Sequence, residues 1–192
     1  MSAISTIRAW KPNSFRPTDL LPNLLGVVRA RWYLRGATHL GPKVRMTGRP
    51  LIRNYGRLDI GPRVRFISFI PPVDIMVGDA GTLTIGESSF INYGVSITAM
   101  ERVTIGRNCN IGTYVMLIDN NFHRLEPERR NETPPSQPIT LEDNVWLGGR
   151  VMVMPGVTIG AGSVVGAGSI VTKDIPARSL AVGVPARVVK TL

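Results

Sequence analysis

The chain has 192 residues, of which 43% are hydrophobic and 6% aromatic, and its formal net charge is +10 at pH 7. This length suits one domain, or one domain with a short extension, and the apolar fraction is enough to form a core. No run of 18 apolar residues and no apolar leader occurs, so we expect neither a membrane-spanning helix nor a targeting signal. A single cysteine, Cys109, excludes a disulfide framework, and we expect a cytoplasmic protein.

The positive charge is concentrated in the first third of the chain. Residues 1–65 contain 13 Lys or Arg and only two acids, Asp19 and Asp59, whereas the remainder contains 10 Lys or Arg and 11 acids. Such a segment is either a solvated face or a surface that meets an anionic partner, and the sequence leaves both readings open. Nucleic acid is the weaker candidate, because no aromatic platform or reading helix accompanies the arginines.

Residues 1–37 are predicted to form an N-terminal extension with a short amphipathic helix. Residues 1–17 have no period, and a helical pattern then runs from Thr18 to Arg35, with Gly36 as its stop. Its apolar residues share one face: Leu21, Leu24, Leu25, Val28 and Trp32. We expect this helix to cap the open end of the domain that follows, because a terminal repeat must be covered. An interfacial membrane helix is the alternative.

Residues 38–192 show a period of six, which is clearest between Val145 and Asp174. An aliphatic residue recurs at every sixth position there: Leu147, Val153, Ile159, Val165 and Val171. This period fits neither the 3.6 residues of a helical turn nor a simple two-residue alternation. It is typical of a parallel β-helix, in which three short strands per coil follow the sides of a triangular prism. Parallel crossovers are right-handed as a rule, and the period gives no reason to expect the other hand.

The same column begins near Leu40 and is interrupted in a regular way. Intervals of eight residues predict one corner lengthened by two residues, at Ile52–Ile60, Val77–Ile85 and Ile97–Ile105. Pro71 and Pro72 predict a bulged coil, and six or seven coils fit the chain. Residues 119–138 carry no inward aliphatic column, and a polar loop of this length extruded from a solenoid is more often functional than idle.

Chemistry-bearing residues are few. His123 lies in the extruded loop and is either a general base or a surface histidine, whereas His39 is expected to be structural. A zinc site needs about three His or Cys ligands, and two histidines with one core cysteine argue against one. The chain also lacks a nucleophile elbow and a phosphate-binding loop. The residues alone therefore predict a β-helix with one histidine-bearing loop.

The hexads, the histidine loop and the run NVWLGGRVMVMPGVTIGAGSVVGAGSIVTKDIP, followed by AVGVPARVV, resemble the hexapeptide-repeat acyltransferases. The resemblance covers residues 58–190 and is closest to maltose and galactoside O-acetyltransferases and their polysaccharide-modifying relatives. It implies an all-β fold, a single-stranded left-handed parallel β-helix with an extruded loop at residues 119–138 and a C-terminal segment at 175–192. It also implies a homotrimer that transfers acetyl from acetyl-CoA to a saccharide hydroxyl in cell-surface polysaccharide biosynthesis, without a metal, at clefts between subunits.

The resemblance also assigns roles to residues of this chain. His123 matches the catalytic base, Asn92 matches the asparagine that holds the acceptor, and Asp119 is a candidate for orienting the imidazole. The remaining matches are cofactor-binding positions: Trp146, Gly149, Ala167, Thr172, Lys173, Arg187 and Lys190. The last two are basic residues suited to the nucleotide phosphates of the cofactor.

One departure from the family bears on the acceptor. The sugar acetyltransferases open with an acidic segment, whereas this chain opens with a basic one, so we expect a nucleotide- or lipid-linked saccharide whose phosphates meet arginines at the inner face of the membrane. Three other functions stay open. They are N-acetylation of an amino sugar, a catalytically inactive scaffold, and a metal-dependent enzyme of the carbonic anhydrase type.

Overall fold

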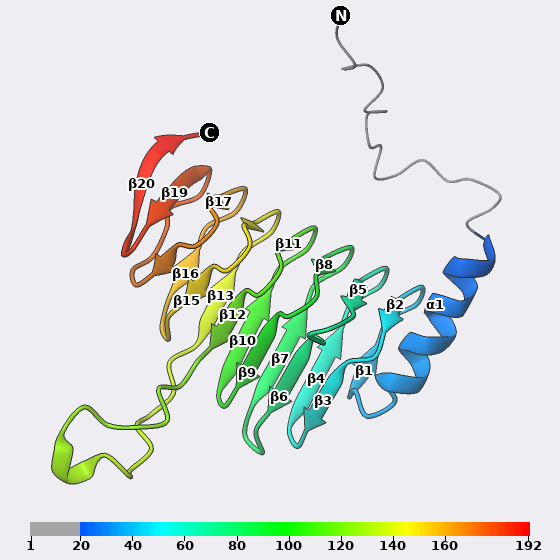
Figure 1. The fold of residues 1–192 in the computed structure, drawn as a ribbon, viewed down its shortest axis with the longest axis horizontal. Helices are drawn as coiled ribbons and strands as arrows, with labels where there is room; N and C mark the ends of the chain where they lie inside the picture. Colours follow the sequence, from blue (N-terminus) through cyan, green and yellow to red (C-terminus); the bar gives the residue numbers. More distant parts are fainter. Residues whose placement is uncertain (1–19) are drawn as a thin grey trace, which may run out of the picture.

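The structure, a computed structural model, describes residues 20–192, except for the side chains of Leu20 and Pro22. The predicted irregular segment and the predicted helix start at Thr18 lie outside the described residues. The described chain is a solenoid of six complete coils with a helix at one end and a hairpin at the other (Figure 1). It is the left-handed parallel β-helix that the resemblance implies.

Three sheets form the sides of the prism, and each takes every third strand. Sheet A contains β1 (His39–Leu40), β4 (Arg57–Ile60), β7 (Thr82–Ile85), β10 (Arg102–Ile105), β13 (Ile139–Leu141) and β16 (Thr158–Ile159). Sheet B contains β2 (Arg45–Gly48), β5 (Arg65–Ser68), β8 (Phe90–Ile91), β11 (Asn110–Ile111), β14 (Trp146–Leu147), β17 (Val164–Val165), β19 (Ser179–Gly183) and β20 (Ala186–Thr191). Sheet C contains β3 (Leu51–Asn54), β6 (Asp74–Val77), β9 (Ser96–Ala99), β12 (Met116–Ile118), β15 (Met152–Val153) and β18 (Ile170–Val171).

The column of aliphatic residues fills the prism, as the period predicts. Leu147, Val153, Ile159, Val165 and Val171 are all at most 1% exposed. Cys109 is also buried, and burial raises the pKa of its thiol, which fits the predicted packing role. Because strand neighbours in all three sheets are parallel up to β19, each coil stacks directly on the one before it.

The long intervals fall where a strand of sheet C passes to the next strand of sheet A, and we call these connections the C–A corner. The predicted column is wrong at one position. Ile75, not Val77, pairs with Ile97, and Val77 pairs with Ala99. Both residues point inward because this strand has four residues and two buried positions. Residues 119–138 leave the solenoid at the same corner, between β12 and β13.

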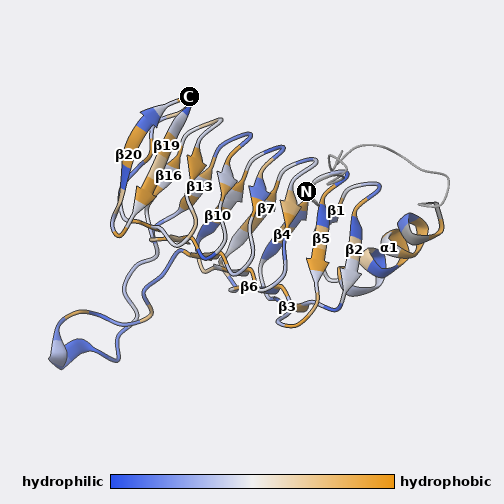
Figure 2. Cartoon of the chain, turned by 45° about the horizontal axis from the view of Figure 1, so that its top comes forward, coloured by the Kyte–Doolittle hydropathy of each residue, from blue (hydrophilic) through white to orange (hydrophobic). Residues whose placement is uncertain are grey.

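Helix α1 (Leu20–Tyr33) covers the open end of the solenoid, but not with the predicted face. Ala30 and Leu34 are 0% and 1% exposed, and Gly26 is buried with the backbone of Met46 beside it. The five residues predicted to face the coil are instead exposed: Leu21 (65%), Leu24 (61%), Leu25 (47%), Val28 (58%) and Trp32 (64%). The small residues face the first coil because they let the helix backbone approach it closely. Figure 2 shows both hydrophobic and hydrophilic residues around this helix.

Candidate active site

The extruded loop is held together by its own polar contacts. Its two ends meet through the Gln137 N–H, which donates to the Asp119 carbonyl at 2.8 Å. The buried Asn120 side chain donates to the Pro134 carbonyl at 2.9 Å and accepts from the Phe122 N–H at 2.5 Å. A short 3-10 helix (Pro127–Arg129) forms the tip, where Arg129 pairs with Glu132 at 2.7 Å. The loop therefore presents its residues from a defined backbone rather than from a loose chain.

The ring of His123 is oriented by the backbone of the same loop. Its Nδ1 lies 2.9 Å from the carbonyl oxygen of Arg130. A carbonyl oxygen only accepts, so Nδ1 must carry the proton of this hydrogen bond. In the neutral ring, Nε2 is then unprotonated and can accept a proton from a substrate. The side chain is exposed in the single chain, so a reacting group can reach it.

Asp119 does not orient the imidazole, and this expectation is wrong. Its carboxylate is buried and accepts hydrogen bonds from the backbone N–H groups of Met100, Glu101 and Arg102, each at 2.8 Å. The residue begins the loop at the C–A corner, where the turn of the preceding coil exposes three N–H groups. A carboxylate satisfies them better than any neutral side chain. The Arg130 carbonyl takes the orienting role instead.

Asn92 lies at a different corner of the prism. The B–C corner comprises the connections from each strand of sheet B to the next strand of sheet C, and Asn92 directly follows β8 there. Its Oδ1 accepts a hydrogen bond from the Tyr93 N–H at 2.9 Å. No hydrogen bond within residues 20–192 engages its Nδ2. The amide NH₂ is therefore free to donate to a ligand at this corner.

Sequence reasoning missed an aromatic surface beside Asn92. The rings of Tyr93 and Tyr114 meet edge to face with centroids 5.7 Å apart, and the guanidinium of Arg150 lies 5.6 Å from the Tyr114 centroid. Such a surface suits a sugar ring with polar groups at its rim. Tyr114 and Arg150 occupy the same position of successive coils, so their stacking could have been found by aligning the coils.

The predicted cofactor positions divide between both corners and the C-terminal hairpin. Gly149 and Ala167 lie on the B–C corner, and no backbone hydrogen bond within residues 20–192 uses the N–H of either. Thr172 and Lys173 follow β18 and lie at the C–A corner. The remaining three residues lie on sheet B. Trp146 is on β14 and is 55% exposed, and Arg187 and Lys190 are on β20.

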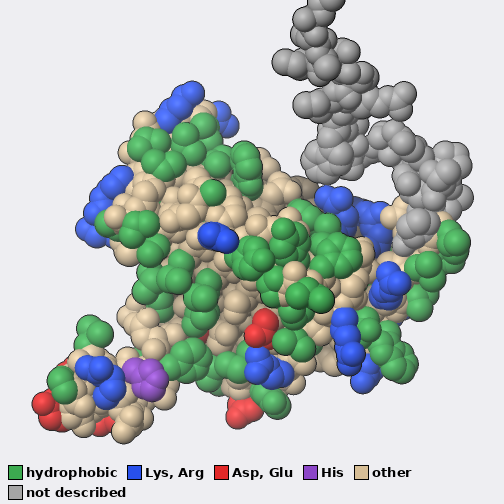
Figure 3. All heavy atoms as spheres, in the orientation of Figure 1, with side chains coloured by type: hydrophobic (Ala, Val, Ile, Leu, Met, Phe, Trp, Pro, Cys, Tyr) green, Lys and Arg blue, Asp and Glu red, His purple; other side chains and the backbone are tan. Residues whose placement is uncertain are grey.

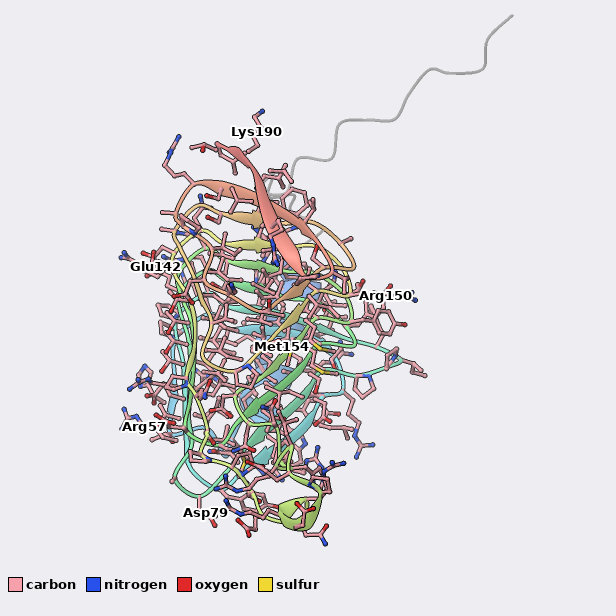
Figure 4. The ribbon with its side chains drawn as sticks, turned by 90° about the vertical axis from the view of Figure 1, so that its left-hand side faces the viewer. Arg57, Asp79, Glu142, Arg150, Met154 and Lys190 are labelled. Atoms are coloured by element: carbon pink, nitrogen blue, oxygen red, sulfur yellow. The ribbon has the colours of Figure 1, made fainter. Side chains whose placement is uncertain are left out.

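The single chain does not bring the two predicted catalytic residues together. Figure 4 views the prism from its C-terminal end, with the loop extending from the corner at which Asp79 lies and Arg150 projecting from another. His123 belongs to the first corner and Asn92 to the second. Sheet C separates the two corners.

The outer face of sheet C is apolar over its last three strands, unlike that of sheet A. One outward row of sheet A is a ladder of threonines: Thr84, Thr104, Thr140 and Thr158. The matching row of sheet C ends in apolar residues: Met116, Met152 and Ile170. Ile118 and Met154 add to this apolar area, and Figure 3 shows hydrophobic side chains gathered beside the histidine loop. These side chains are half-buried in the single chain, and a contiguous apolar area of this kind is typical of an interaction face.

Residues 20–192 contain no group of three His, Cys, Asp or Glu residues that could hold a metal ion. No helix in the same range has both the length and the apolarity needed to cross a membrane.

The chain is similar to several known proteins. Residues 138–173 match the family described as bacterial transferase hexapeptide (six repeats). A putative lipopolysaccharide biosynthesis O-acetyl transferase of Escherichia coli is 34% identical over 72% of this chain and 74% of its own length. The crystal structure of a hexapeptide-repeat acetyltransferase of Vibrio cholerae, complexed with acetyl coenzyme A, is 32% identical with a TM-score of 0.65, covering 86% of this chain and 76% of the other.

Other relatives are matched over a shorter part. The galactoside O-acetyltransferase of Escherichia coli is 43% identical over 64% of this chain, and the chain spans 59% of that protein. The chain spans 52% of the length of a putative acetyltransferase of Schizosaccharomyces pombe. The repeat, the fold and the extended similarity agree, and the chain belongs to the hexapeptide-repeat acyltransferase family.

Proposed function

We propose that this chain is an acetyl-CoA-dependent O-acetyltransferase that acts on a saccharide hydroxyl and works as a homotrimer. The observation that carries the proposal is the division of the site between the two corners that border sheet C, whose last three strands are apolar on the outside. When three prisms pack with this sheet toward one axis, the B–C corner of one subunit faces the C–A corner of the next. Each cleft between subunits then receives Asn92 from one chain and His123 from another.

The proposed reaction is direct transfer of the acetyl group. Nε2 of His123 takes the proton of the acceptor hydroxyl, whose oxygen attacks the thioester carbonyl and forms a tetrahedral oxyanion. Collapse of this intermediate breaks the carbon–sulfur bond, and the imidazolium returns the proton to the thiolate that leaves. The Arg130 carbonyl stabilises the imidazolium through Nδ1, and the amide NH₂ of Asn92 holds the acceptor.

The proposed cofactor contacts need no metal. Acetyl-CoA has an extended amide-bearing arm, which can pair with the unoccupied N–H groups of Gly149 and Ala167 on the B–C corner. Thr172 and Lys173 of the adjacent subunit would line the other side of the cleft. Arg187 and Lys190 would meet the nucleotide phosphates, and Trp146 would pack along the arm. The acetyl coenzyme A complex of the Vibrio cholerae protein supports this choice of cofactor.

A saccharide of a cell-surface polysaccharide pathway is the proposed acceptor, handled on the cytoplasmic side of the membrane. The similarity to the lipopolysaccharide O-acetyl transferase and the aromatic surface at Tyr93 and Tyr114 support this class. The basic first coils favour an acceptor linked to a nucleotide or a lipid through phosphates. N-acetylation of an amino sugar is the nearest rival, because the same base serves an amine.

Mixing two inactive variants tests the shared site. We expect His123→Ala and Asn92→Ala to be nearly inactive alone, but to regain about a quarter of wild-type activity after they are unfolded together in equal amounts and refolded. One quarter is expected because each cleft needs an intact histidine from one chain and an intact asparagine from the next, and each is present with a probability of about one half. Each variant refolded alone is the control. No recovery in mixed trimers would place the site within one chain.

Turnover of different acceptors tests the acceptor class. We expect a lipid- or nucleotide-linked oligosaccharide to be acetylated at least about tenfold faster, measured as kcat/KM, than the matching free glycoside, because phosphates add charge-assisted contacts to arginines. Released thiol provides the readout. Equal kcat/KM values would contradict the phosphate-linked acceptor, and faster reaction of an amino sugar amine would favour the N-acetyltransferase.

A further inference from the structure

The surface formed by the exposed face of α1 and the groove beside it is not used by the proposed chemistry. We call it the α1 surface, and it comprises Leu21, Leu24, Leu25, Val28 and Trp32 with the groove residues Arg35, Arg49, Pro50 and Leu51. The helix presents its larger apolar residues to solvent while its small residues meet the solenoid. Monomeric proteins rarely leave such a contiguous apolar stripe uncovered, so it marks an interaction site.

Basic residues surround this stripe. Helix positions advance by about 100° per residue, which puts Arg29 and Arg31 on either side of it. The guanidinium of Arg35 lies 5.0 Å from the centroid of the Trp32 ring. None of these three arginines forms an ion pair within residues 20–192. Helix α1 contains no acid, and Asp59 is the only acid among residues 20–65, against ten Lys or Arg.

The groove extends the same combination of chemistry onto the first coil. It has a volume of about 510 Å³ and runs between the end of α1 and the loop before β3, with Trp32 and Leu51 supplying apolar area and Arg35 and Arg49 supplying charge. Leu51 is 53% exposed. A positively charged rim around apolar residues fits a ligand that is both anionic and apolar, such as a phospholipid.

We propose that the α1 surface docks this protein onto an anionic membrane surface. A helix that exposes a stripe of apolar residues between arginines can bind in the interfacial region, with its apolar residues among the acyl chains and its arginines among the headgroups. Tryptophan is favoured at this depth because its ring is apolar and its N–H is polar. This inference goes beyond the proposed function and does not depend on it.

The charge of the surface argues against two other occupants. A second copy of the chain would bring the same arginines together, and like charges in an interface oppose association. The segment formed by residues 1–19 carries Arg8, Lys11 and Arg16 against one acid, so it would also add positive charge. An anionic partner relieves this repulsion, and the length of the apolar stripe selects a lipid surface.

Co-sedimentation of the full chain with vesicles tests the inference. We expect the protein to bind phosphatidylcholine vesicles containing about one third phosphatidylglycerol and to bind pure phosphatidylcholine at least about tenfold more weakly. Leu24→Ser with Val28→Ser should weaken binding to the anionic vesicles by at least about tenfold, because both side chains would insert. Leu125→Ser is the matched control, since Leu125 is 90% exposed in the extruded loop and far from α1.

The charges are tested separately. Arg29→Gln with Arg31→Gln should weaken binding about 25-fold, since each arginine near an anionic surface contributes about fivefold. Arg102→Gln with Arg178→Gln removes the same net charge at exposed positions elsewhere and should bind as the wild type does. Acetylation of a soluble acceptor should be unchanged in the α1 variants, so a failure of docking and a failure of the proposed enzyme are distinguishable.

Three results would overturn the inference. They are equal binding to neutral and anionic vesicles, unchanged binding of the stripe variant, and unchanged binding of the arginine variant. Sedimentation velocity adds a fourth. If the stripe variant forms a smaller assembly than the wild type, the α1 surface is covered by a second copy.

Discussion

Replacing His123 by alanine is expected to lower acetyl-CoA-dependent turnover by about a hundredfold or more, at the low end of the loss expected for a general base. The structure gives the physical reason. The Arg130 carbonyl fixes the Nδ1 proton, so Nε2 is the unprotonated nitrogen of a residue that is exposed in the single chain. Alanine removes the proton acceptor but leaves the backbone contacts of the loop in place. Release of free thiol from acetyl-CoA in the presence of a saccharide acceptor measures the effect.

The chain offers a matched control, because its only other histidine, His39, is also exposed. His39→Ala should keep wild-type turnover. Binding of CoA to the His123 variant should be retained, which separates loss of the base from loss of the cofactor site. Turnover within a few fold of wild type in His123→Ala would contradict the assigned base. A similar loss of turnover in His39→Ala would indicate that removing a histidine lowers turnover by disturbing the fold.

Replacing Asp119 by alanine is expected to lower the free energy of unfolding by about 3 kcal/mol or more. The substitution removes three part-buried hydrogen bonds to a charged acceptor, and each hydrogen bond of this kind contributes about 1.5–3 kcal/mol. For a chain of this size the midpoint of thermal unfolding should fall by roughly 6–12 °C. The loop should also become more accessible to proteolysis, because the carboxylate ties its first residue to the turn at Met100–Arg102.

Asp174→Ala provides the comparison for this second effect. Within residues 20–192 its carboxylate accepts one backbone hydrogen bond, from the Thr158 N–H at 2.7 Å, in an exposed setting. We therefore expect a loss well below that of Asp119→Ala. Equal losses in the two variants would contradict the view that the number of anchored N–H groups sets the cost. An Asp119→Ala protein that is fully stable yet inactive would instead return Asp119 to a catalytic role.

The solenoid was predictable from sequence because its signal is repeated in every coil. The hexad column, the long corner and the extruded loop each follow from the spacing of aliphatic residues, and all three are found in the structure, except that Ile75 takes the place of Val77 in the column. The orientation of α1 was not predictable in the same way. A helical period identifies an apolar face, but the small residues Gly26 and Ala30 decided which face the first coil accepts.

The candidate site was harder to derive because contacts between distant parts of the chain leave no period. Asp119 precedes His123 by four residues, yet its oxygens meet N–H groups from the previous coil. The hydrogen-bond partner of the imidazole is the backbone carbonyl of Arg130. Every residue has such a group, so the residue types in the sequence do not identify it. The separation of His123 from Asn92 likewise follows from the corners that they occupy, and linear spacing does not reveal it.

The extruded loop is closed at its base and is structurally separate from the stacked sheets. Its ends meet at the hydrogen bond between Gln137 and Asp119, and the coils on either side keep their register across the insertion, with Val103 beside Ile139 and Met116 beside Met152. The length and sequence between these ends can therefore change without disturbing the stacked sheets. Loops tolerate changes in length and sequence better than the elements they connect, so the surroundings of His123 can diverge while the register of the coils is kept.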